Sequence, residues 1–210
     1  MHWFGFALLV FVFFCYPAAA QKPQTDTAGA AWSFGAEGYY YVTPHDNNLF
    51  SFTGYADHKS GLHLEARYNY EDRNTVSAFA GWRLETGNKL AFAATPMIGF
   101  MAGNSRGIIP ALELELNYKR LDFYSETEYV IDFSGKENTY LYTWSELSFR
   151  PLANLYTGVS IQRSLAYQTG YEVQKGPMVK YAFRSITAGF YYFNPFTSNN
   201  VFVFSVGADF

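Results

Sequence analysis

After its N-terminal segment, the chain alternates apolar and polar residues and shows no helical period. In 110–119, for example, Leu112 and Leu114 fall on one side of an extended chain and Glu113 and Glu115 on the other. Because the side chains of a β-strand point alternately to its two faces, this period of two predicts strands with one apolar and one polar face. The strands expected from the pattern are 32–43, 48–57, 62–71, 75–85, 89–101, 108–119, 121–133, 139–149, 154–166, 173–184, 186–196 and 200–210. We therefore expect an all-β protein of about twelve strands, with about ten as the alternative count.

The length of these segments favours strands that cross a membrane. Soluble strands average about five or six residues, whereas a tilted transmembrane strand needs about nine to eleven. The connections alternate as well: tight ones follow even-numbered strands, as at 120–121 and 184–186, and longer ones follow odd-numbered strands, as at 133–138 and 194–200. Short turns on one side and long loops on the other are typical of outer-membrane barrels, in which an even strand count leaves both chain ends on the periplasmic side.

A two-faced strand does not by itself distinguish a soluble protein from a membrane protein. In a soluble sandwich or barrel the apolar face points inward, whereas in a membrane barrel it meets lipid. Aromatic clusters near the expected strand ends, such as 39–41 and 190–193, favour the membrane because interfacial belts are rich in aromatic side chains. A sheet in lipid must also lack open edges, since unpaired backbone groups there cost several kcal/mol each. We therefore expect a closed antiparallel transmembrane β-barrel over 32–210.

The last expected strand carries a further signal. Counting back by two from Phe210 gives Ala208, Val206, Phe204 and Phe202 on one face. A final amphipathic strand that ends in Phe resembles the C-terminal assembly signal of bacterial outer-membrane proteins, which their insertion machinery reads. The resemblance implies that Phe210 belongs to such a signal, and that the barrel-insertion machinery and outer-membrane lipid are partners of this chain.

The N-terminal segment has the pattern of an export signal. Residues 4–15 form a compact apolar run, Pro17 breaks it, and 18–20 are the small residues that a signal peptidase requires. We expect a signal peptide over 1–20, a short disordered leader over 21–31, and a location in the bacterial cell outer membrane. A membrane helix is the alternative, because Lys and Arg are absent near the start, although the run is short for a helix that spans a bilayer. The single cysteine falls within the expected signal, so the mature chain would have no disulfide.

Composition supports the barrel and excludes one class of partner. Hydrophobic residues make up 49% of the chain and aromatic residues 20%. The mean hydropathy is nevertheless only −0.11, because polar residues interrupt the apolar ones throughout. The formal net charge is −3, with no basic face or tail, so we expect no nucleic acid partner.

If the polar faces point inward, ionic side chains line the barrel. The residues expected there are Glu65, Arg67, Arg83, Glu113, Glu115, Glu126, Glu128, Glu146, Arg150, Arg163, Lys180 and Arg184. Two interpretations remain open. A well-paired salt-bridge network would fill a narrow interior. Alternatively, the interior is a water-filled pore, since about twelve strands lie between the filled barrels of about eight and the channels of about sixteen.

An enzyme that acts on outer-membrane lipid is a further alternative. Such a site needs a nucleophile, a base and an orienting group in one place. Ser125 and Ser145 fall on apolar faces, but no histidine shares those faces nearby. His63 lies beside Glu65 and Arg67 on a polar face, where we expect a structural ion-pair role. The sequence shows no catalytic motif and no Cys pair, and we expect no catalytic residue, metal or cofactor.

In its pattern of strands and connections, the mature chain resembles small bacterial outer-membrane porins and channels of the twelve-stranded kind. No motif identifies a solute, and no functional residue is carried over from that family. The resemblance implies passive diffusion of a small polar solute, which is an argument from fold. A structural or surface-interaction barrel, with its function in the extracellular loops, is the alternative.

Overall fold

The computed structural model describes residues 31–44, 47–166 and 172–210. Within these ranges the chain is all-β apart from one short 3₁₀ helix, η1 (Lys136–Asn138). The strands are β1 (Trp32–Val42), β2 (Leu49–His58), β3 (Leu62–Tyr68), β4 (Thr75–Trp82), β5 (Leu84–Thr86), β6 (Leu90–Gly103), β7 (Gly107–Tyr118), β8 (Leu121–Asp132), β9 (Tyr140–Leu152), β10 (Leu155–Ala166), β11 (Glu172–Phe183), β12 (Ile186–Phe193) and β13 (Val201–Asp209). The signal peptide expected over 1–20 and the leader up to residue 30 lie outside the described residues. In the described part of the chain, no helix is long and apolar enough to cross a membrane.

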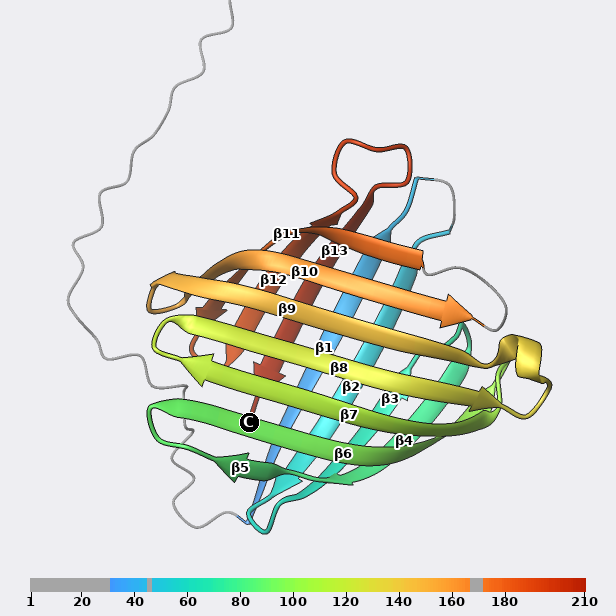
Figure 1. Cartoon of the computed structure of the whole chain (residues 1–210), viewed down its shortest axis with the longest axis horizontal. Helices are drawn as coiled ribbons and strands as arrows, with labels where there is room; N and C mark the ends of the chain where they lie inside the picture. Colours follow the sequence, from blue (N-terminus) through green and yellow to red (C-terminus); the bar gives the residue numbers. More distant parts are fainter. Residues whose placement is uncertain (1–30, 45–46, 167–171) are drawn as a thin grey trace, which may run out of the picture.

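The strands form a single closed antiparallel sheet (Figure 1). Apart from β4 and β5, each strand pairs with its neighbours in sequence, and β1 pairs with both β2 and β13, which closes the ring. β4 and β5 pair with β6 in one continuous register, so they are two parts of one wall strand. The wall described by the structure therefore has the twelve strands that the alternation predicts. At the seam, the backbone groups of Phe34 and Phe210 bond each other at 2.8 and 3.2 Å.

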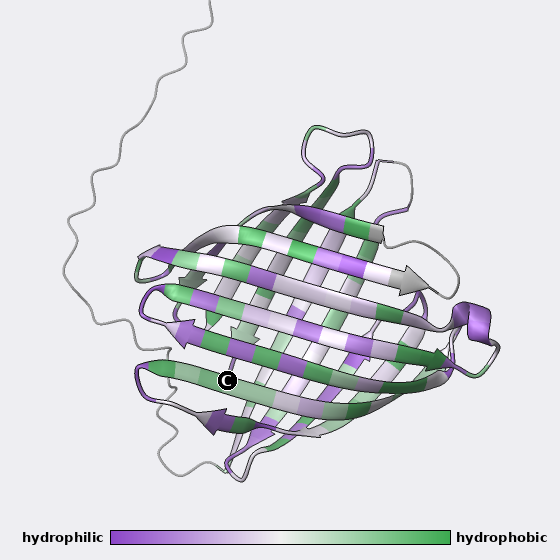
Figure 2. Ribbon diagram, in the orientation of Figure 1, coloured by the Kyte–Doolittle hydropathy of each residue, from purple (hydrophilic) through white to green (hydrophobic). Residues whose placement is uncertain are grey.

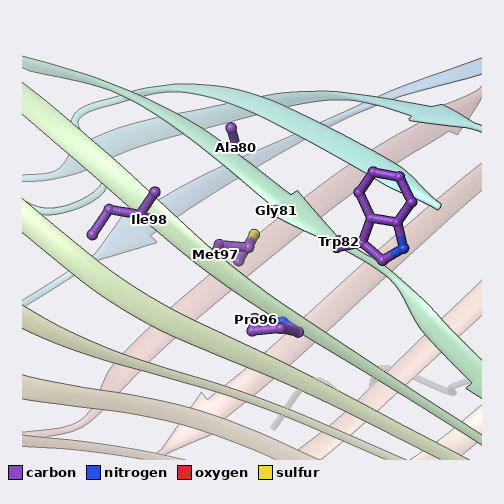
Figure 3. A pocket seen from close by; sticks show the side chains of 6 residues that line it. All are labelled: Ala80, Gly81, Trp82, Pro96, Met97 and Ile98. Carbon is purple, nitrogen blue, oxygen red and sulfur yellow. The ribbon is translucent and has the colours of Figure 1, made fainter.

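The break between β4 and β5 has a local cause. Pro96 on β6 lies opposite Trp82, where the two segments meet, and proline has no N–H to donate to the ladder. Arg83 keeps a backbone bond on the other side, from its N–H to the Gly61 carbonyl at 2.7 Å. A pocket lies at this point, and Figure 3 shows the side chains that line it, among them Trp82, Pro96 and Ile98. Trp82 and Ile98 are exposed on the outer face, so this pocket opens to the outside of the barrel.

The two faces of the wall differ in polarity, and hydrophobic and hydrophilic residues alternate along the strands (Figure 2). Outward side chains are largely apolar and exposed, as for Val179 and Phe204, whereas the inward side chains of Arg67 and Glu126 are buried. Leu112 would lie in the dry centre of a soluble barrel, but it is 38% exposed on the outer face. An apolar outer face with ionic groups inside is the arrangement of a transmembrane barrel. The predicted fold class is therefore confirmed.

Two strands end earlier than the pattern predicts. β3 ends at Tyr68 and β12 at Phe193, each three residues before its expected end. The next residues are Asn69 with φ 55° and Asn194 with φ 46°. Asn tolerates this left-handed conformation better than most residues, and it turns the chain out of the strand and into a long loop.

Candidate functional site: the barrel interior

Arg67 is the centre of an ion cluster that joins two walls of the barrel. It projects inward from β3 and binds Glu65 on the same strand, with Nη2 at 2.5 Å from the carboxylate. It also binds two carboxylates of β8, Glu126 at 2.7 Å and Glu128. β3 and β8 are not neighbours in the sheet, so these ion pairs cross the interior. We call Arg67, Glu65, Glu126 and Glu128 the Arg67 cluster.

The loop after β3 covers the Arg67 cluster. The Tyr70 hydroxyl donates a hydrogen bond to Glu126 at 2.6 Å. The Glu71 carboxylate lies 3.8 Å from the Arg67 guanidinium and accepts a hydrogen bond from Ser77 at 2.7 Å. Burial raises the pKa of the Glu71 carboxyl, although Arg67 acts to lower it. This loop therefore shields the Arg67 cluster from water on the long-loop side.

His63 extends the Arg67 cluster toward the end of the barrel with the tight turns. Its Nδ1 lies 2.7 Å from Asp57, and its Nε2 lies 2.8 Å from Glu65. Ligand-capable atoms of His63, Glu65 and Glu113 lie within 4.8 Å of one another. A divalent cation at these atoms would have to displace the hydrogen between His63 and Glu65. With a carboxylate at each ring nitrogen, His63 has the geometry of the structural ion-pair role predicted for it.

A group of aromatic side chains fills the interior beside β9. Trp144 packs edge-on against Tyr191 and Phe193 of β12, with ring centroids 5.3 and 5.4 Å apart. Tyr39 of β1 packs on it in the same way at 5.9 Å. The Glu146 carboxylate accepts hydrogen bonds from Trp144 Nε1 at 2.9 Å and from the Tyr191 hydroxyl at 2.7 Å. Aromatic packing and a buried carboxylate thus hold this part of the interior together.

Further ion pairs lie on the inner face, away from the Arg67 cluster. They are Lys180 with Glu146 at 2.5 Å, Arg150 with Asp122 at 2.8 Å, and Arg83 with Glu115 at 2.6 Å. The three basic side chains are 18 to 21% exposed, in contrast to 2% for Arg67. These pairs therefore remain in contact with water.

The interior is not filled evenly. Inward side chains on the β3 and β8 walls are buried, as for Arg67 and Glu128. Some inward residues on the facing part of the wall keep partial exposure: Glu37, Tyr39, Tyr142, Gln162, Gln174 and Lys180. They come from β1, β9, β10 and β11 and lie in both halves of the barrel, and between the two groups the buried Trp144, Met178 and Tyr191 fill the interior. We call these partly water-exposed residues the hydrated lane.

The structure places ten of the twelve residues predicted to line the barrel on its inner face: Glu65, Arg67, Arg83, Glu113, Glu115, Glu126, Glu128, Glu146, Arg150 and Lys180. Arg163 and Arg184 lie elsewhere. Arg163 is exposed on the outer face of β10 with Ile161, because the register of this strand turns Ser160 inward. Arg184 lies in the turn after β11 with φ 55°, and its guanidinium is 5.3 Å from the Phe183 ring.

The interior also contains residues that the sequence reasoning did not identify. Trp144 and Tyr39 lie two residues from Glu146 and Glu37, so the alternation of their strands places them on the inner face. That alternation was the available signal, but the aromatic cluster 39–41 was assigned to an interfacial belt instead. Glu71 ends the expected strand 62–71 on the same face as Glu65 and Arg67, but the structure places it in the loop beyond the end of β3.

The serines on the outer face form no catalytic arrangement within the described residues. The hydroxyl oxygens of Ser125 and Ser145 lie 2.9 Å apart across β8 and β9. The histidines that the structure describes lie elsewhere, His58 in contact with Ser60 at a tight turn and His63 inside the barrel. The two serines therefore pair with each other.

No family model matches the sequence, and no curated protein matches it. The structure is similar to the KdgM porin, with a TM-score of 0.60 and 12% identity over 84% of this chain and 98% of that one. The KdgM porin in complex with disordered oligogalacturonate gives a TM-score of 0.60 at 11% identity, over the same shares of the two chains. The NanC porin gives 0.53 at 10% identity, over 84% of this chain and 98% of that one. At these identities the similarity establishes the fold, and the chain has the closed barrel fold of outer-membrane porins.

Proposed function

We propose that this chain forms a passive channel for small polar solutes in the bacterial outer membrane. The observation that carries the proposal is the hydrated lane inside a closed barrel whose outer face is apolar. The outer face suits lipid, and partly hydrated polar groups along the inside suit the passage of a hydrated solute. Because the Arg67 cluster and the aromatic group around Trp144 fill part of the interior, the passage is narrow. The fold shared with KdgM and NanC supports this function, which requires no catalytic step.

The molecule named in one similar structure is not carried over to this chain. KdgM was solved with an oligogalacturonate, a sugar chain that bears carboxylates. Here the inner face is itself rich in carboxylates, among them Glu113 and Glu126. Like charges in a narrow passage repel, so we do not extend that solute to this chain.

Conductance in planar lipid bilayers tests the proposal. The purified, refolded chain is expected to give discrete current steps. A matched pair of variants on β10 then locates the passage: Gln162→Trp places a large ring in the hydrated lane, and Ile161→Trp places the same ring on the outer face. Gln162→Trp is expected to lower the unit conductance, and Ile161→Trp to leave it unchanged. Equal effects of the two variants would contradict the proposed position of the passage.

The second candidate is a structural or surface-interaction barrel. The observation that favours it is the Arg67 cluster, which crosses the interior and is buried. If such packing closes the whole cross-section, the bilayer stays silent over many insertions of folded protein. That result would refute the channel and leave the structural barrel.

The last strand supports a proposal about assembly. β13 ends at the seam, where Phe210 bonds Phe34 of the first strand, and its outer face includes the exposed Phe204 and Val206. We infer that the barrel-insertion machinery of the outer membrane binds this strand while the barrel is still open.

A further inference from the structure

Acidic and basic residues are divided unequally between the two faces of the barrel. Among the described strand residues, ten carboxylates point inward without being fully exposed: Glu37, Asp57, Glu65, Glu113, Glu115, Asp122, Glu126, Glu128, Asp132 and Glu146. The inward Arg and Lys residues are four: Arg67, Arg150 and Lys180 in the same strands, and Arg83 between β4 and β5. His63 adds at most one positive charge. The formal net charge of −3 for the whole chain therefore conceals a much more acidic interior.

The four inward basic residues are each engaged by carboxylates. Arg67 alone binds three carboxylates. Lys180 binds Glu146, while Arg150 and Arg83 bind Asp122 and Glu115. No cluster of basic side chains that would attract an anion is therefore present on the inner face within the described residues.

The acidic excess reaches the water-exposed part of the interior. Glu37 belongs to the hydrated lane. Glu113 is also partly exposed, and the group that donates a hydrogen bond to it is the neutral hydroxyl of Tyr124, at 2.9 Å. These two carboxylates lie on β1 and β7, so the acidic character is not confined to one side of the barrel.

From this arrangement we propose that the channel passes cations in preference to anions. The inference rests on the proposed channel function and names its solute class. Acidic groups along a passage with low-dielectric walls produce a negative potential that raises the local concentration of cations and lowers that of anions. Rings of Asp and Glu side chains confer cation selectivity on channels by the same effect.

The reversal potential of the refolded chain under a KCl gradient tests the proposal. The expected sign is that of a cation-selective channel, with potassium several-fold more permeant than chloride. Acidifying the solution is expected to reduce the selectivity of the wild-type chain, because protonation removes the carboxylate charges. This measurement needs no variant.

A matched set of variants assigns the selectivity to the interior. In alkaline solution, in which both carboxyls are ionised, Glu37→Gln combined with Glu113→Gln keeps the shape of both side chains and removes two inward charges, and it is expected to shift the reversal potential toward zero. Glu137→Gln removes a charge from the exposed turn η1 and is expected to change nothing.

The outcomes separate this inference from the proposed function. A conducting chain that prefers chloride, or that shows no preference, overturns the inference and leaves the channel intact. A silent bilayer refutes the channel and the inference together. If Glu137→Gln shifts the reversal potential as much as the double variant at Glu37 and Glu113 does, the assignment of the selectivity to the interior is overturned.

Discussion

Replacing Arg67 with Met should destabilise the barrel strongly. The guanidinium is 2% exposed, binds Glu65, Glu126 and Glu128, and lies 4.1 Å from the centre of the Phe79 ring. Methionine fills much of the same space but leaves three buried carboxylates without their shared cation. Removing one partner of a buried ion pair costs about 3–5 kcal/mol. We therefore expect the free energy of unfolding to fall by about 3–5 kcal/mol.

Urea unfolding of the barrel in lipid vesicles, followed by tryptophan fluorescence, measures this change. Arg163→Met is the matched control, because Arg163 is exposed on the outer face. It is expected to change the free energy of unfolding by about 1 kcal/mol or less, because Arg163 lies near the long-loop end of β10. A second variant combines Arg67→Met with Glu126→Gln and Glu128→Gln. It should lose less stability than Arg67→Met alone, because neutral amides replace two of the uncompensated charges.

Two results would refute this reasoning. One is a loss below about 1 kcal/mol for Arg67→Met, which is the range of exposed ion pairs and would mean that water enters the Arg67 cluster. The other is a combined variant whose free energy of unfolding is clearly lower than that of Arg67→Met alone. In that case the carboxylates would stabilise the barrel through contacts other than those with Arg67.

Three further predictions concern the aromatic group, the wall and the seam. Trp144→Ala is expected to raise the unit conductance in planar bilayers, because the ring packs between β1 and β12 inside the barrel; an unchanged conductance would place the passage elsewhere. Gly158→Ala should destabilise the barrel by about 1–3 kcal/mol in urea titrations, because the added methyl group would overlap a carbonyl of β9. Gly207→Ala should be nearly neutral, because the nearest atom to its added methyl group lies at 3.6 Å. Deleting Phe210 should reduce insertion of the chain into the outer membrane of bacterial cells, measured by fractionation. The control, Phe196→Ala in an exposed loop, should not reduce it. Equal insertion of the two variants would count against a signal in the last strand.

Much of the fold could be predicted from the sequence because a β-strand encodes its faces locally. In β7 and β8 the alternation separated outward residues such as Leu112 and Tyr129 from inward residues such as Glu113 and Glu128 before any contact was known. The number of strands followed from the same pattern and from the turns between them. A misplaced boundary does not alter these assignments, because the side-chain period of two continues along the whole strand.

The alternation was weakest where both faces of a strand carry polar residues. β10 has Ser160 and Gln162 on one face and Arg163 on the other, so the sequence could not distinguish inside from outside for Arg163. Hydrogen bonding with β9 and β11 settles its orientation, since Arg163 pairs with Thr143 and Val173. The register between strands thus decided what the polarity of this segment left open.

The sequence alone determined that the chain forms two-faced strands of membrane-spanning length and that ionic residues gather on one face. Only the tertiary structure decided which ionic residues meet, as Arg67 and Glu128 do from strands that are not neighbours in the sheet. The physical reason is that alternation is a property of adjacent residues, whereas contacts across a barrel depend on closure and on the register of every strand pair between them. For the same reason, the filled wall and the hydrated lane beside it could be located only in the closed structure.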